Sequence, residues 1–178
     1  LKSSLFYNIF QNIFYKPKKT FSECFGEDLF INHYFKDNIS GTFIDVGCNQ
    51  PVINSLTHSL YNKNWQGINI DISKRSIDLH NFLRKKSINY NIAVGERTKE
   101  IEAFIFYENC TMNTVNKRFK KYTEVSVSKK PVVNRVKQFT LNQIIEKNNL
   151  KKIDFLNIDI EGNEMNVLKG FNITKYKP

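Results

Sequence analysis

The sequence predicts one globular α/β domain, with a mostly parallel sheet covered by helices on both faces. The first observation is that short β-branched strands alternate with helical segments from residue 42 onwards. The second is segment 153–160 (IDFLNIDI), which is strongly apolar, as is typical of a strand buried on both faces. Third, 40% of the 178 residues are hydrophobic and only 7 are Gly and 4 Pro, which excludes disordered and collagen-like chains.

The expected elements follow in order along the chain. The patterns predict strands at 42–46, 67–72, 88–94, 101–107, 132–139 and 153–160. They predict helices at 52–63, 74–86, 141–148 and 163–168. We expect an N-terminal helical segment at 1–40 and the α/β domain at 41–178, with a basic insertion at 108–137. A doubly wound sheet normally continues with a further strand, so we expect this chain to be truncated before its last strands.

The N-terminal segment contains two predicted helices, at 2–15 and 26–37. The first places six apolar side chains on one face: Leu5, Phe6, Ile9, Phe10, Ile13 and Phe14. We expect this face to dock on its own domain or on a partner, and a membrane interface is the alternative. The second helix is expected to bury Leu29, Phe30, Tyr34 and Phe35.

Charge, apolar runs and cysteine content exclude several classes of protein. There are 27 Lys and Arg residues against 17 Asp and Glu, a formal net charge of +10. No run approaches the roughly 18 apolar residues of a transmembrane helix. Three scattered cysteines, Cys24, Cys48 and Cys110, form neither a disulfide framework nor a zinc motif. We therefore expect free thiols and a cytoplasmic protein.

Acidic residues mark the ends of the first two predicted strands, where an open α/β sheet binds its ligands. The loop that begins at Asp45 reads D-V-G-C-N and is not G-x-G-x-x-G, which disfavours a dinucleotide and a dehydrogenase. Asp45 can accept a hydrogen bond from an ammonium group, and Gly47 lets the backbone approach a ligand. Asp71 can accept from both ribose hydroxyls. Together they indicate a nucleoside with an amino-acid end, such as S-adenosylmethionine.

A third cluster of acids follows the strand at 153–160. Asp159 and Glu161 point the same way if the strand persists that far. They can act as the general base for an acceptor hydroxyl, or bind Mg²⁺ or Mn²⁺. Glu164 falls in the first turn of the next helix, where we expect it to have a structural role.

The segment 41–73 resembles the FkbM-type S-adenosylmethionine-dependent methyltransferases, and is closest to the branch found in bacterial surface-polysaccharide clusters. The matching residues are Asp45, Gly47, Pro51, Ser55, Thr57, Leu60, Tyr61, Trp65, Gly67, Asn69 and Asp71. Leu56 and Asn64 depart from the pattern, because the family usually has Asn and Gly there. Three further blocks resemble the family in the correct order: FGEDL at 25–29, NIAVG at 91–95 and DFLNIDIEGNEMNVL at 154–168.

The resemblance covers residues 21–178 and implies a Rossmann-like methyltransferase fold. It implies that S-adenosylmethionine is bound by Asp45, Gly47 and Asn49 at its methionine part, by Asp71 at the ribose, and by Asn91, Ile92 and Ala93 along the adenine. Cys48 and Ile72 are also expected among the cofactor-binding residues. It also implies an O-methyltransferase for a sugar hydroxyl in polysaccharide or glycan biosynthesis.

The positive charge is concentrated in segment 117–137, which has eight Lys and Arg residues and one acid, Glu124. Such a segment near the ligand favours an anionic small-molecule or glycan acceptor. RNA is the rival, because Phe119 and Tyr122 lie among the basic residues and could stack on bases. Two alternatives therefore stay open beside the sugar methyltransferase: an RNA methyltransferase, and a methyltransferase fold that binds a partner without turnover.

Overall fold

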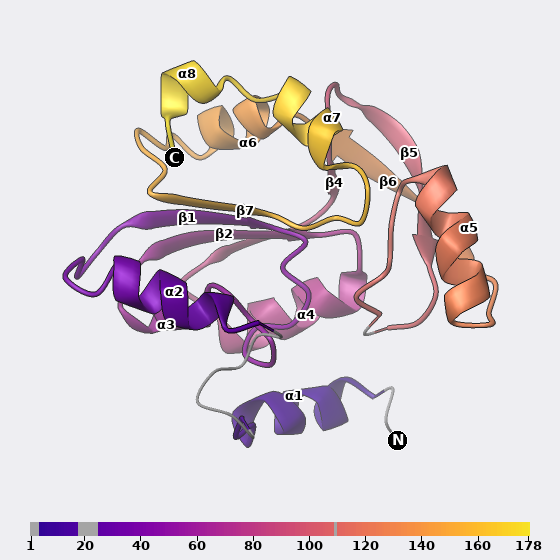
Figure 1. Cartoon of the computed structure of the whole chain (residues 1–178), viewed down its shortest axis with the longest axis horizontal. Coiled ribbons are helices and arrows are strands. Elements are labelled where there is room, and N and C mark those ends of the chain that lie inside the picture. Colours follow the sequence, from indigo (N-terminus) through magenta and orange to yellow (C-terminus); the bar gives the residue numbers. More distant parts are fainter. Residues whose placement is uncertain (1–3, 18–24, 109) are drawn as a thin grey trace.

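The computed structural model describes residues 4–17, 25–108 and 110–178. A four-stranded parallel sheet lies at its centre, in the order β3-β2-β1-β7. These strands are β1 (Thr42–Val46), β2 (Gln66–Asp71), β3 (Ile88–Asn91) and β7 (Phe155–Ile158). One face carries α2 (Glu27–Tyr34), α3 (His58–Asn62) and α4 (Lys74–Leu83), and the other carries α6 (Leu141–Lys147), α7 (Glu164–Lys169) and α8 (Ile173–Tyr176) (Figure 1). The predicted parallel sheet with helices on both faces is confirmed.

The central strands are buried because both of their faces meet apolar helices. On one face, Ile44 and Ile68 belong to a core that includes Leu141 and Ile145 of α6. On the other face, Phe43 belongs to a second core. The other buried members of that second core are Ile31, Phe35, Leu60 and Trp65. Strands packed on both faces explain why their sequences read as apolar runs.

A second, three-stranded sheet has the order β4-β6-β5. Its strands are β4 (Ala93–Val94), β5 (Lys99–Ile105) and β6 (Val132–Phe139), and α5 (Lys117–Ser126) lies between β5 and β6 in the chain. The single strand predicted at 88–94 is therefore wrong, because the chain leaves the central sheet after Asn91 and pairs Ala93 with Gln138. Asn91 also donates its side-chain amide to the carbonyl of Asp71 at the end of β3.

The helix predicted at 52–63 is also wrong in its first half, since only His58–Asn62 is helical. In the loop between β1 and α3, backbone groups form hydrogen bonds with side chains that are distant in sequence. The Oδ1 atom of Asn12 accepts from the N–H groups of Val52 and Ile53, and Arg84 donates to the carbonyl of Pro51. These tertiary hydrogen bonds hold the loop backbone in a non-helical conformation, although its sequence favours a helix.

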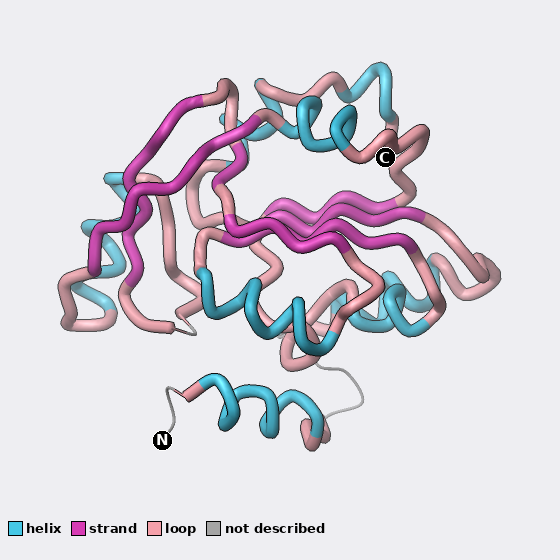
Figure 2. Tube along the Cα trace, turned by 180° about the vertical axis from the view of Figure 1, so that it is seen from behind, coloured by secondary structure: helices cyan, strands magenta, loops and turns pink. Residues whose placement is uncertain are grey.

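The two N-terminal helices bury other faces than the sequence predicts. Helix α1 (Leu5–Ile13) forms an outer layer beside α4, and Figure 2 shows it from behind. It buries Asn8, Ile9 and Asn12, while four of the six apolar residues predicted to dock, namely Phe6, Phe10, Ile13 and Phe14, are exposed. In α2, Leu29, Phe30 and Tyr34 are exposed, and Ile31 and Phe35 are buried against the second core.

No helix in the described residues is long and apolar enough to cross a membrane. Cys48 and Cys110 are buried free thiols, and Cys24 lies outside the described residues.

Arg84, which follows α4, is 1% exposed and ties α4 to the loop after β1. Its guanidinium donates to the carbonyl of Pro51, to Ser55 Oγ at 2.6 Å and to Thr57 Oγ1 at 2.8 Å. It also donates to Asn69 Oδ1 of β2 at 3.3 Å. Burial lowers the pKa of Arg84 to about 10, which still leaves the group charged at neutral pH.

Replacing Arg84 by Met should lower the free energy of unfolding by about 3 kcal/mol, because buried acceptors on the loop lose their donor. Urea unfolding followed by fluorescence of the buried Trp65, the one tryptophan in the sequence, measures this. The matched control is Arg97→Met at an exposed site, where a change within about 0.5 kcal/mol is expected. Equal effects of the two substitutions would contradict a structural role for the buried guanidinium.

Candidate functional site

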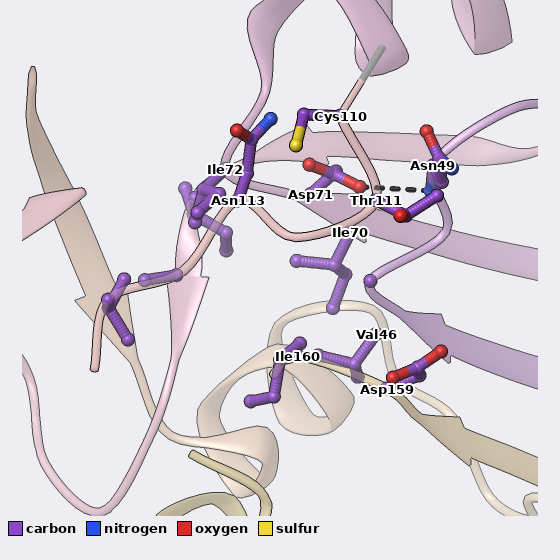
Figure 3. Close-up of a pocket in the computed structure, with 14 residues that line it drawn as sticks. Val46, Asn49, Ile70, Asp71, Ile72, Cys110, Thr111, Asn113, Asp159 and Ile160 are labelled. Carbon is purple, nitrogen blue, oxygen red and sulfur yellow. Dashed lines mark hydrogen bonds between the residues drawn. The ribbon is translucent and has the colours of Figure 1, made fainter. Parts of the chain in front are cut away.

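The candidate site lies at the carboxyl ends of β1, β2 and β7, where the strand order reverses beside β1. Two adjoining pockets open there and share Gly47, Asn49, Thr111 and Asp159 in their walls. The apolar pocket, shown in Figure 3, is lined by Val46, Gly47, Asn49, Ile70, Asp71, Ile72, Ile92, Ala93, Cys110, Thr111, Asn113, Val115, Asp159 and Ile160. The acidic pocket is lined by Glu27, Asp45, Gly47, Cys48, Asn49, Asn54, Ser55, Leu56, Thr111, Asn157 and Asp159.

Gly47 brings the loop after β1 against the corner after β7. Its φ of +88° lies in the left-handed region that favours glycine. A Cβ atom at this position would lie 1.8 Å from the carbonyl oxygen of Asp159, which no side chain can accommodate. The N–H groups of Gly47 and Cys48 donate to the carbonyl of Ile70, so the same loop is also fixed to β2. At Gly47 the wall shared by both pockets therefore consists of backbone without a side chain.

Asp71 ends β2 and points into the apolar pocket (Figure 3). One carboxylate oxygen accepts from the N–H of Asn49 at 2.9 Å, and the other accepts from the N–H of Ser73 at 2.7 Å. Burial raises the pKa of Asp71 to about 6, although both hydrogen bonds favour the ionised form. Each oxygen keeps a lone pair that can accept from a ligand hydroxyl.

Asp45 lies in the acidic pocket and is 2% exposed. Its Oδ2 accepts from the hydroxyl of Thr57 at 2.7 Å, and its Oδ1 accepts from the amide of Asn157 at 2.9 Å. The same Thr57 hydroxyl accepts a hydrogen bond from the guanidinium of Arg84, so it bridges the buried Arg84 and the Asp45 carboxylate. Glu27 and Asp159 line the same pocket, and three acids around one cavity favour a cationic group.

The other predicted cofactor residues divide between the pockets. Cys48 lines the acidic pocket, and burial raises the pKa of its thiol well above the usual value. Ile72, Ile92 and Ala93 line the apolar pocket. Asn91 lies outside both, because its side chain bonds to the carbonyl of Asp71 and it borders a neighbouring cavity.

The corner after β7 separates the two predicted catalytic acids. The strand ends at Ile158 and Glu161 has a left-handed φ of 57°, so the condition under which Asp159 and Glu161 would point the same way is not met. Asp159 lines both pockets, whereas Glu161 lines neither and accepts from Thr114 through its main-chain carbonyl. Burial, and then nearby acids, raise the pKa of both side chains.

Glu164 stabilises this corner, in agreement with its expected structural role. Its carboxylate accepts from the N–H of Ile160 at 3.1 Å and from that of Gly162 at 3.0 Å. In the described part of the chain, no group of three His, Cys, Asp or Glu side chains is arranged to hold a metal ion. The proposed Mg²⁺ or Mn²⁺ site at Asp159 and Glu161 therefore gains no support from the structure.

Parts of the site are not predicted from the sequence. Segment 110–115 supplies Cys110, Thr111, Asn113 and Val115 to the apolar pocket, and nothing in its own sequence indicates this, since only tertiary structure brings it over the strand ends. Asn157 was also missed. A polar residue in the middle of the apolar strand at 153–160 was a signal that could have identified it.

The strand order and the pockets at the strand ends are consistent with a Rossmann-like methyltransferase fold. The family model for the methyltransferase FkbM domain matches residues 45–178, and the chain belongs to this methyltransferase family. Comparisons with curated proteins and with solved structures gave no match.

Replacing Gly47 by Ala should lower the free energy of unfolding by about 3 kcal/mol or more, because the Cβ meets backbone and φ is positive. Gly162→Ala is the matched control. It also has positive φ, but its Cβ would meet first the flexible side chain of Asn116 at 3.1 Å, so about 1 kcal/mol is expected. Urea unfolding of both variants measures the difference. An equal loss of unfolding free energy in both variants would mean that the positive φ, and not the contact with Asp159, requires glycine at position 47.

Proposed function

We propose that this chain is an S-adenosylmethionine-dependent O-methyltransferase that acts on a sugar hydroxyl in glycan biosynthesis. The observation that carries the proposal is the placement of Asp71 and Asp45 in two adjoining pockets, with the Gly47 backbone between them. A ligand with a nucleoside end and a cationic amino-acid end matches that arrangement.

The residues present fit the two ends of S-adenosylmethionine. Asp71 accepts from the ribose hydroxyls, and Ile72 with Ile92 offers apolar contacts for the adenine. Asp45, in the acidic pocket, accepts from the ammonium group. The cofactor supplies a methyl group on a positively charged sulfonium, which suits a cavity lined by Glu27, Asp45 and Asp159.

Asp159 is the proposed general base for the acceptor hydroxyl. It lines both the pocket proposed for the nucleoside end of the cofactor and the pocket proposed for its amino-acid end. Its raised pKa, caused by burial and by Glu164, makes its carboxylate a stronger base than an exposed aspartate. Glu161 is proposed as a secondary acid at the same corner.

The sugar acceptor is supported by the resemblance of segment 41–73 to the polysaccharide branch of the family. An anionic acceptor is supported by cations near the site: Lys74, Arg75 and Arg135 line a cavity that also contains Ile72 and Asn91. Arg75 pairs with Glu108 at 2.7 Å and Arg135 with Glu100 at 3.6 Å, so these cations are already partly neutralised. That pairing weakens the case for RNA more than the case for a small anionic sugar.

Affinity for S-adenosylhomocysteine should rise as pH increases through about 6, because ribose hydroxyls donate to the ionised Asp71 and burial holds its pKa near that value. Calorimetric titration on both sides of this pH measures it. Asp71→Asn should weaken binding roughly 100-fold and remove the pH dependence. The matched control is Asp78→Asn, which removes only an exposed ion pair with Lys74. Wild-type affinity in Asp71→Asn would refute the assignment.

Asp159→Asn should lower methyl transfer by about 100-fold or more while S-adenosylhomocysteine still binds. Glu161→Gln should have a smaller effect, because Glu161 lines neither pocket. The assay follows transfer of a labelled methyl group to sugar nucleotides, with RNA as the competing acceptor and with Mg²⁺ or a chelator present. Equal loss in the two variants would contradict the separate roles. A folded chain that binds the product but methylates no acceptor would favour the non-catalytic binding module.

A further inference from the structure

The outward face of α1 is apolar and has no partner in the described part of the chain. The side chains of Phe6, Phe10, Ile13 and Phe14 are 86%, 59%, 56% and 63% exposed. The rings of Phe10 and Phe14 lie against each other, with centroids 4.4 Å apart. Three aromatic rings and an isoleucine on one short helix form a surface that water solvates poorly.

Polar contacts on the opposite side hold α1 with this face outward. Asn12 accepts from the N–H groups of Val52 and Ile53, and its own amide donates to the side chain of Gln50. Asn8 and Asn12 are at most 2% exposed. Turning the helix to bury its aromatic face would leave the loop N–H groups without their acceptor. The exposed aromatic face is therefore a property of the docked helix.

The sequence on either side of α1 carries positive charge. Residues 1–22 contain Lys2, Lys16, Lys18 and Lys19 and no acid. Lys16, the one of these within the described residues, is exposed just past the last turn of the helix. A short apolar face in a segment rich in lysine complements a lipid bilayer, whose anionic headgroups lie above its hydrocarbon core.

A second copy of the chain is a poorer occupant than a lipid surface. A nine-residue helix is about 14 Å long and, with its side chains, about 10 Å wide. Its face is far smaller than the roughly 800 Å² that each partner buries in a stable protein interface. A bilayer needs no such area, because each phenyl ring partitions independently.

We propose that α1 lies in the interface of an anionic lipid bilayer, with Phe6, Phe10, Ile13 and Phe14 among the acyl chains and Lys16 near the phosphates. Because α1 is docked on the loop after β1, it would hold the methyltransferase domain at the membrane surface. The proposal goes beyond the methyl transfer reaction and does not depend on it.

Co-sedimentation with vesicles tests the proposal. The chain should bind vesicles of phosphatidylcholine mixed with phosphatidylglycerol, and more weakly those of phosphatidylcholine alone or at high salt. Phe6→Ser combined with Phe10→Ser should lower the partition coefficient roughly tenfold to hundredfold. The matched control is Phe30→Ser combined with Tyr34→Ser on α2, where two equally exposed aromatic residues are lost, and it should bind like the wild type.

Three outcomes would overturn the proposal. The wild type could fail to bind mixed vesicles, the α1 and α2 variants could lose binding equally, or sedimentation velocity could show a dimer that the α1 variant alone abolishes. Titration with S-adenosylhomocysteine on the same samples checks that each variant is folded. It also separates a failure of membrane binding from a failure of the proposed cofactor site.

Discussion

The Arg84 guanidinium is buried between the sheet and the loop after β1, and the geometry of the site depends on it. A buried cation must have acceptors on all sides, and here those are loop atoms of Pro51, Ser55 and Thr57. Thr57 in turn donates a hydrogen bond to Asp45 and so fixes the orientation of its carboxylate. One desolvated charge thus sets the course of the loop and the orientation of a carboxylate in the acidic pocket.

The other constraint on the site is the close approach of two strand ends. Gly47 and the carbonyl of Asp159 are so near that no side chain fits between them in the wall shared by the pockets. Glu164 holds the turn on the β7 side through the N–H groups of Ile160 and Gly162. The wall is therefore fixed from both strands.

Much of the fold could be predicted from sequence because strands buried on both faces have distinctive apolar runs. Asp45, Gly47 and Asp71 could be predicted as well, since they lie at or beside the carboxyl ends of such strands. Contacts distant in sequence could not be predicted. The helix predicted at 52–63 begins only at His58, and α1 packs on the protein through its polar face. Both features depend on side chains from other elements. Helical periodicity identified the apolar face of α1 correctly, but periodicity does not say which face meets the protein.

The short connection at Ile92 joins the central sheet to the second sheet, and the apolar pocket lies at that seam. Its walls combine strand ends of the central sheet with segment 110–115, which β5 precedes and β6 follows. Any molecule that fills the pocket adds its binding free energy to the association of the two sheets. A ligand bound in this pocket should therefore make the two sheets harder to separate than they are in the ligand-free protein.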